Sequence, residues 1–274
     1  MVATENSSRE IRRCFLFILV AYVFTWFFWI PDALNKMGLI PVSPLTGLGF
    51  IGAFGPLVSA IIVTSVYEGK DGVKNLFKKV LDHRFKKRWW LPVFFLMPAL
   101  VLVAFAIAVL TDGIVPPLEA LSQPAILVPA FFSVLLLSGP FEEEFGWRGY
   151  ALPRLQARFN PHVSSVVLGM VWAAWHLPQF IIPGNGMFYK TPLWTFFPTV
   201  VAATFLFTWI YNNTNGSMMT SLLFHTTFNF SMFVFPVLDT NFGYVYVLVI
   251  FVVAAALVTA FSGSLKTRKI NVQQ

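Results

Sequence analysis

Long apolar segments recur along almost the whole chain, and they constrain its fold more than any other feature. A helix needs about 20 mainly apolar residues to cross a bilayer, and only helices and closed barrels satisfy their backbone hydrogen bonds there. The apolar runs are unbroken rather than alternating, which favours helices. The sequence therefore predicts an all-α integral membrane protein, a bundle of eight transmembrane helices, at about residues 11–30, 47–67, 89–110, 125–152, 162–183, 193–211, 217–236 and 244–261.

The composition leaves no room for a separate soluble domain. Of the 274 residues, 57% are hydrophobic and 11% are charged, whereas a soluble domain carries about 25% charged residues. Residues 1–274 are therefore expected to form a single polytopic membrane domain. The one cysteine, Cys14, excludes an internal disulfide and a cysteine-based metal cluster.

The stretch between the second and third predicted spans is rich in lysine and arginine. Val73, Leu76, Phe77 and Val80 recur at helical spacing among the basic residues, which predicts an amphipathic interfacial helix. We expect its residues 70–88 to contact anionic lipid headgroups. A basic chain can also suit a nucleic-acid partner, but the position of these charges between membrane spans argues against one, and no nucleic acid is expected.

The basic residues also predict the orientation of the chain. With eight spans, both termini lie on one side of the membrane, and every Lys and Arg except Lys36 and Lys190 falls on that side. Loops rich in Lys and Arg stay in the cytosol. We therefore expect a multi-pass protein of the cell membrane with both termini cytosolic.

Strongly polar residues lie at membrane depth in three of the predicted spans. Ionisable groups there are costly, so they are usually functional or paired with one another. In the span that includes residues 125–152, Glu144 and Arg148 are four apart and share a helix face. Glu143 is rotated from Glu144 by about 100°, so the arginine can hold one carboxylate while the other points elsewhere.

Two later spans carry the other polar groups. Trp172 and His176 share a face of one span, so that the indole can stack on the imidazole or wall it in, and His225 and Asn229 share a face of another. At about 1.5 Å per residue, Glu143 and His225 lie at a similar depth below the cytosolic helix ends, with His176 deeper. We expect these spans to converge on one site that faces the cytosol.

This set of residues suits the hydrolysis of a peptide bond. The reaction needs a base for water, an acid for the leaving amine and donors for the oxyanion. Glu143 with His176 could activate water, and His225 with Asn229 could bind the oxyanion. No serine or cysteine lies in a convincing setting for a nucleophile, which argues against an acyl-enzyme.

A zinc site competes with this interpretation. Glu143, His176 and His225 would match a catalytic zinc with three protein ligands and one water. The sequence has no H-E-x-x-H motif, and the three ligands would come from three helices. We favour chemistry without a metal and keep zinc as the alternative cofactor.

Each polar group also has a plainer explanation. A Glu–Arg pair near a helix end can be only a salt bridge, and a lone histidine or a His–Asn pair can join helices by hydrogen bonds. Two other classes of function are kept. In a small ion-coupled transporter these groups would relay protons, and a non-catalytic immunity or binding protein would only occupy the membrane surface of a partner.

The motifs together resemble the CPBP family of intramembrane proteases, which comprises type II CAAX prenyl proteases and bacterial Abi-like proteins. The resemblance is carried by Glu143-Glu144-x-x-x-Arg148, Trp172-x-x-x-His176 and His225-x-x-x-Asn229 in this order, over about residues 125–235. The first position of the second motif is often Phe in the family, and the tryptophan here is not expected to alter the chemistry.

The resemblance implies a membrane endopeptidase with Glu143 and His176 activating water and with His225 and Asn229 binding the oxyanion. It implies that Glu144 and Arg148 hold Glu143 and His176 in place. The family has been described both as metalloproteases and as glutamate proteases. Eukaryotic members remove the last three residues of prenylated CAAX proteins, so the expected substrate is a peptide or a lipidated protein.

Overall fold

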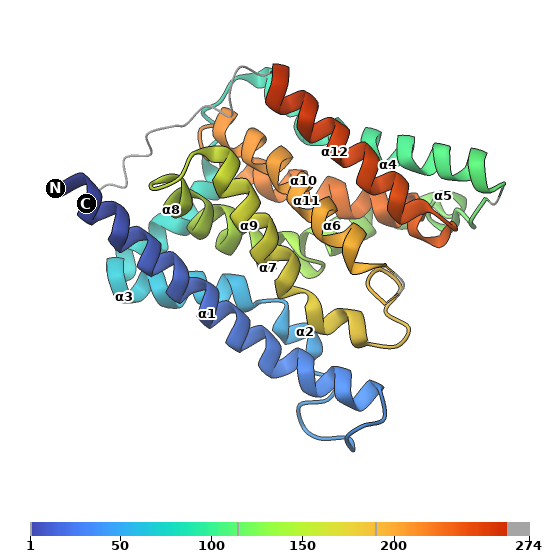
Figure 1. Ribbon diagram of the computed structural model, residues 1–274, viewed down its shortest axis with the longest axis horizontal. Helices are drawn as coiled ribbons and strands as arrows, with labels where there is room; N and C mark the ends of the chain where they lie inside the picture. The colour runs from blue at the N-terminus through green and yellow to red at the C-terminus, as the bar shows by residue number, and fades with distance from the viewer. Residues whose placement is uncertain (1, 114, 190, 262–274) are drawn as a thin grey trace.

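A computed structural model describes residues 2–113, 115–189 and 191–261, and these residues form helices and connecting turns without a strand (Figure 1). The long helices lie side by side as a bundle. The elements are α1 (Val2–Lys36), α2 (Gly49–Gly52), α3 (Gly55–Lys78), η1 (Lys79–Leu81), η2 (Lys87–Trp89), α4 (Trp90–Asp112), α5 (Glu119–Ser122), η3 (Pro124–Ile126), α6 (Leu127–Leu137), α7 (Pro140–Gly146), the π-helical turn η4 (Trp147–Ala151), α8 (Leu152–Gln156), α9 (Pro161–Trp175), η5 (Leu177–Ile181), α10 (Leu193–Asn213), α11 (Met218–Val234), η6 (Val237–Asp239) and α12 (Gly243–Phe261).

Six helical segments of the described chain are long and apolar enough to cross a membrane, rather than the eight predicted. They are Ser7–Lys36, Lys87–Asp112, Pro124–Gln156, Leu193–Asn213, Met218–Asp239 and Gly243–Phe261. The other two predicted spans correspond to α3 and α9. Gly69 has a left-handed φ of 66° and kinks α3, and α9 has 15 residues, so neither offers a long apolar helix.

Helices α3 and α9 nevertheless run antiparallel to neighbouring long helices. At the end of α2, the Gly52 carbonyl accepts from Thr25 Oγ1 at 2.8 Å, and in α3 Ser59 Oγ donates to the Phe17 carbonyl at 2.7 Å. Further along, the Arg13 guanidinium lies over the Tyr67 ring. Helix α3 therefore packs along α1 in the antiparallel direction.

Helix α9 is placed against α10 in the same way. Ser165 Oγ donates to Thr208 Oγ1 at 2.8 Å near the beginning of α9. At its end, the His176 ring contacts the Phe196 ring. The predicted helix over residues 162–183 is therefore wrong in its second half, because the α-helix ends at Trp175 and η5 follows.

The predicted continuous helix over residues 125–152 is broken in two places. Helix α6 ends at Leu137, and Gly139 adopts φ = 106° before Pro140 begins α7. A positive φ of this kind is easily adopted by glycine and interrupts the helical hydrogen bonds. The π-helical turn Trp147–Ala151 then shifts the register between α7 and α8.

The predicted amphipathic helix is shorter than expected and packs partly on the protein. Helical structure ends at Leu81, and residues 82–86 form a loop. Leu76 is buried, and the Phe77 ring contacts the Phe145 ring of α7 at 4.8 Å. The apolar side of this segment was expected to contact lipid, but it packs against the bundle, partly on α7.

The two ends of the bundle are tied by different loops. At the end where α1 begins, Ser217 Oγ donates to the Asp82 carbonyl at 2.6 Å. At the opposite end, Thr111 Oγ1 donates to Tyr246 Oη at 2.8 Å. Figure 1 shows the end of α1 and the beginnings of α10 and α12 at this second end. Lys190 and the tail residues Lys266, Arg268 and Lys269, which entered the prediction of orientation, lie outside the described residues.

Candidate active site

The break before α7 presents the acidic residues at the beginning of a helix. Glu142 Oε2 accepts the backbone N–H of Gly139 at 2.9 Å and caps α7. The Glu143 N–H donates to the Gly139 carbonyl at 2.8 Å. Carboxylates in the first turn of a helix are favoured by its positive end. The turn therefore fixes the backbone that carries Glu143 within the bundle.

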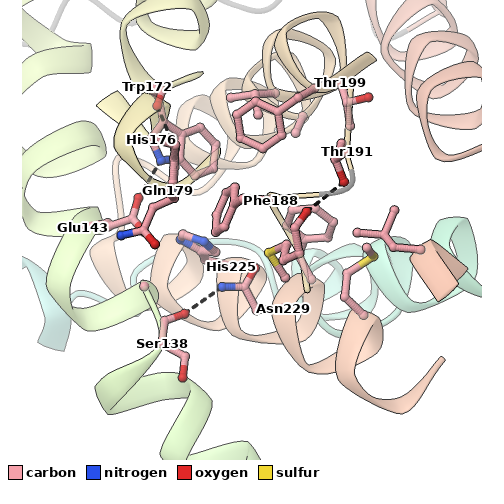
Figure 2. Close-up of a pocket in the computed structure, with 18 of the residues that line it drawn as sticks. Ser138, Glu143, Trp172, His176, Gln179, Phe188, Thr191, Thr199, His225 and Asn229 are labelled. Carbon is pink, nitrogen blue, oxygen red and sulfur yellow. Dashed lines mark hydrogen bonds between the residues drawn. The ribbon is translucent and has the colours of Figure 1, made fainter. Parts of the chain in front are cut away.

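Two tryptophans hold one oxygen of Glu143. The indole Nε1 atoms of Trp147 and Trp172 donate to Glu143 Oε2 at 3.0 and 2.5 Å. The Glu143 side chain is almost fully buried. Because Oε2 takes both indole donors, Oε1 is the oxygen left for a ligand (Figure 2).

Glu144 is the centre of a second, fully buried group. Its Oε1 accepts from Arg148 Nη1 at 2.7 Å and lies 2.8 Å from His225 Nδ1. The Arg148 guanidinium lies over the rings of Trp172 and Phe207, at 4.3 and 3.9 Å from their centroids. The predicted Glu144–Arg148 pair is present. The resemblance implied that this pair holds Glu143 and His176, whereas the structure shows Glu144 in contact with His225.

Asn229 and His225 meet Glu143 in front of Gly139. Asn229 Nδ2 donates to the Ser138 carbonyl at 2.8 Å. A Cβ built on Gly139 would lie 2.8 Å from Glu143 Oε1, 3.2 Å from Asn229 Nδ2 and 3.5 Å from His225 Cε1. Side chains from two helices that are distant in sequence therefore surround one small volume at the break between α6 and α7.

His176 ends α9 and lies among aromatic rings. Its Nδ1 lies 2.9 Å from the Trp172 carbonyl, so Nδ1 carries the proton in this contact and Nε2 is the remaining acceptor. The Phe188 ring stacks on the imidazole at 5.2 Å and 24°. The Trp172 ring is 6.2 Å away and tilted by 51°, so the predicted indole is a neighbour rather than a stacked partner.

One cavity of about 490 Å³ joins the four candidate residues Glu143, His176, His225 and Asn229 (Figure 2). The rest of its wall is mainly aromatic and aliphatic, with a few polar groups such as Gln179. Glu144 and Arg148 are not part of the wall. They lie behind it and support the residues that face the cavity.

The wall of the cavity continues toward the end of the bundle where α10 and α12 begin. It includes Phe188 and Thr191 from the loop before α10, Leu238 of η6 and Tyr244 of α12. The sequence predicts a site that faces the cytosol, and this remains a prediction. The depth of Glu143 was counted along an unbroken helix through residues 125–152, which the structure breaks around α7.

The spacing of the side chains does not match the alternative zinc site. Within residues 2–113, 115–189 and 191–261, no three His, Cys, Asp or Glu side chains are grouped closely enough to hold a metal ion. Glu143, His176 and His225 line one cavity but do not form a three-ligand set. As arranged, these residues do not fit the zinc site, and no chemical step is derived through a metal.

Several functional positions were not predicted from the sequence. Trp147 donates to Glu143 Oε2, and Glu142 accepts from the Gly139 N–H in the turn before α7. The Ser138 carbonyl orients Asn229. The Gly139-Pro140 dipeptide was the available signal, since Gly and Pro together mark a break. The direction of an indole N–H has no such signal, because it depends on tertiary packing.

The buried Glu144–Arg148 pair gives a direct prediction for stability. Arg148→Met leaves Glu144 as a buried carboxylate without its guanidinium partner, which costs about 3–5 kcal/mol. We expect a large fall in the thermal unfolding temperature in detergent. Glu144→Gln/Arg148→Met removes both charges and should recover part of that loss. Equal unfolding temperatures for wild type and Arg148→Met would show that the pair does not stabilise the bundle.

Comparison with known proteins agrees with this geometry. Residues 124–231 match the model of the family described as type II CAAX prenyl endopeptidase Rce1-like. The chain is also 25% identical over 257 residues to CAAX prenyl protease 2 of Methanococcus maripaludis, an alignment that covers 89% of this chain and 92% of that protein. The matched region contains the break, the three acidic residues, both histidines and Asn229. Residues 124–231 are therefore similar to type II CAAX prenyl endopeptidases, and six helical segments of the described chain are long and apolar enough to cross a membrane.

Proposed function

We propose that the protein is an intramembrane endopeptidase in which Glu143 activates the attacking water. The observation that carries the proposal is the convergence of Glu143 Oε1, Asn229 Nδ2 and His225 Cε1 within 3.5 Å of one point in front of Gly139. A base and two potential donors around one volume meet the geometric needs of hydrolysis. The cavity supplies room for a peptide beside that point.

In the proposed reaction, Glu143 Oε1 takes a proton from water while the water oxygen attacks the carbonyl carbon of the scissile bond. His176 Nδ1 donates to the Trp172 carbonyl, so His176 Nε2 can accept a hydrogen bond from the other O–H of this water and orient it. Glu143 then delivers the proton to the leaving nitrogen as the carbon–nitrogen bond breaks. Glu143 is then a carboxylate again, ready for the next water.

Asn229 and His225 are the proposed donors to the oxyanion. The Asn229 amide carries two N–H bonds, of which one is used by the Ser138 carbonyl. His225 Nδ1 faces Glu144, so Nε2 donates only when the ring is an imidazolium. In that form, the cluster of Glu143, Glu144, Arg148 and His225 has no net charge.

We propose that the substrate is a peptide with an apolar or lipidated segment next to the scissile bond. The largely aromatic and aliphatic wall of the cavity supports this choice. The name of the Methanococcus relative makes a prenylated CAAX-type C-terminus the first class to test. We propose specificity for a prenylated substrate only by analogy with that relative.

We also propose eight membrane crossings with both termini in the cytosol. The antiparallel course of α3 along α1 and of α9 along α10 supports the two crossings made by the kinked helix α3 and the short helix α9. The positions of the basic residues support the orientation. In this arrangement the exposed lysines of residues 70–88 face anionic headgroups of the inner leaflet.

One observation favours the carrier as a second candidate. The fourth apolar segment is discontinuous at Ser138–Gly139, and broken helices that line a midplane cavity are typical of transporters. A carrier would move its substrate across proteoliposomes without hydrolysing it. Flux without cleavage, unchanged in Glu143→Gln, would favour this second function.

The proposed base is tested by Glu143→Gln, which keeps the shape of the side chain and removes its basicity. We expect the turnover rate to fall by about 10²–10⁴-fold, measured by mass spectrometry on a peptide library with and without a farnesyl group. Glu119→Gln makes the same change at an exposed position outside the cavity and should be neutral. Each assay is repeated with a metal chelator, and loss of cleavage on chelation would contradict metal-free chemistry. Undiminished cleavage by Glu143→Gln would contradict the proposed base.

The small volume at Gly139 gives a second test. Gly139→Ala places a methyl group 2.8 Å from Glu143 Oε1, so we expect turnover to fall by about 10²-fold or more because water is displaced. Gly113→Ala is the matched control, since Gly113 also has a positive φ but faces open space. If both variants fold and lose the same amount of activity, backbone strain rather than the occupied volume explains the effect.

A further inference from the structure

The wall of the cavity beside Glu143 carries acidic side chains without a basic residue to balance them. Glu142 and Glu143 both line the cavity, whereas no Lys or Arg from the described part of the chain does. When His225 is an imidazolium, its charge and that of Arg148 balance the charges of Glu143 and Glu144. Glu142 is then the acidic group of the wall whose charge is left over.

Glu142 is buried, and it differs from Glu144 in its partners. The residue is 3% exposed, and its Oε2 accepts the Gly139 N–H at 2.9 Å. None of the ion pairs among the residues that the structure describes includes Glu142, whereas Glu144 has Arg148 at 2.7 Å. A buried carboxylate without a cationic partner is costly. A cation that a substrate brings into the cavity would remove this cost.

Glu142 also lies close to the proposed point of hydrolysis. Its Oε2 accepts the Gly139 N–H, and the nitrogen of this group is two covalent bonds from the Cβ position in front of Gly139 where the base and the oxyanion donors converge (Figure 2). Glu142 Oε2 is therefore within about 6 Å of that point. Each residue of an extended peptide spans about 3.3–3.6 Å, so the carboxylate is within reach of a side chain one or two positions from the scissile bond.

From the charge, the burial and the position of this side chain, we infer that Glu142 determines specificity by binding a basic side chain of the substrate. The inference rests on the proposed protease function and names Lys or Arg, within two positions of the scissile bond, as the recognised group. Hydrogen bonds between such a cation and a carboxylate are stronger than neutral ones. The largely apolar wall suits the hydrocarbon stem of the same side chain, because Lys and Arg pack their stems on apolar surface. The substrate class is a peptide with an apolar segment and a basic residue beside its cleavage site.

The hydrogen bond to Gly139 gives Glu142 a structural role as well. Glu142 is the third residue of α7, a position from which Glu or Gln can cap a helix by accepting the N–H of the residue before it. This cap needs an acceptor oxygen but no charge. Glu142→Gln therefore keeps the cap and removes the charge, so the two roles can be separated.

The test compares peptides that share an apolar membrane anchor and differ at one position. They carry lysine, norleucine or glutamate, placed in turn at each position of a short extended segment beside the anchor, and an arginine series separates the two basic groups. The value of kcat/KM is measured for the wild type, for Glu142→Gln and for Glu119→Gln, the exposed control outside the cavity. Binding of the same peptides to Glu143→Gln, with and without Glu142→Gln, measures recognition apart from catalysis.

We expect the wild type and Glu119→Gln to prefer lysine over norleucine by about 10–100-fold at one of these positions, because a hydrogen bond to a charged group is stronger than a neutral one. In Glu142→Gln this preference should disappear in hydrolysis and in binding. The glutamate peptide should be cleaved faster by Glu142→Gln than by the wild type, because the repulsion between like charges is removed.

Two results would overturn the inference and leave the protease function in place. One is an equal preference for lysine in the wild type and in Glu142→Gln. The other is an equal fall in the hydrolysis of all three peptides by Glu142→Gln, which would show a structural role only. If no peptide is cleaved but binding prefers lysine and loses this preference in Glu142→Gln, the recognition holds and the protease function is contradicted.

Discussion

The structure depends on the neutralisation of charge inside an apolar bundle. Glu144 has no exposure to solvent; Arg148 at 2.7 Å compensates its charge, and His225 Nδ1 lies 2.8 Å from the same oxygen. Unpaired ions at such a place would cost several kcal/mol each. Because α7 and α11 meet through this carboxylate, the same contact that makes the charges tolerable also brings His225 and Asn229 to Glu143. Stability and the geometry of the site therefore come from one interaction.

Neighbouring carboxylates have different tasks because their surroundings differ. Glu144 contacts Arg148 and His225 and lies behind the cavity wall. Glu143 instead receives two indole N–H bonds on one oxygen and presents the other to the cavity. Trp172 lines the cavity and also donates a hydrogen bond to Glu143. A phenylalanine could not donate to Glu143, so the tryptophan expected to be chemically neutral is part of the base's hydrogen-bond set.

Helical periodicity was enough to predict the Glu144–Arg148 pair and the shared face of His225 and Asn229, because both depend only on spacing within one helix. The all-helical membrane layout also follows from apolar length. What could not be predicted depends on tertiary packing: the direction of the Trp147 indole and the contact of Glu144 with His225. The break at Gly139 and the early end of α9 could not be predicted either, and they move Glu143 and His176 relative to the helix ends.

The central claim is that Glu143 activates water and does not itself become acylated. A single turnover in water enriched in oxygen-18, analysed by mass spectrometry, tests it most directly. Direct attack by water places the heavy oxygen in the new carboxyl group of the product during the first turnover and leaves Glu143 unlabelled. Appearance of the label in Glu143, with unlabelled product after that turnover, would instead show attack by the carboxylate and contradict the account.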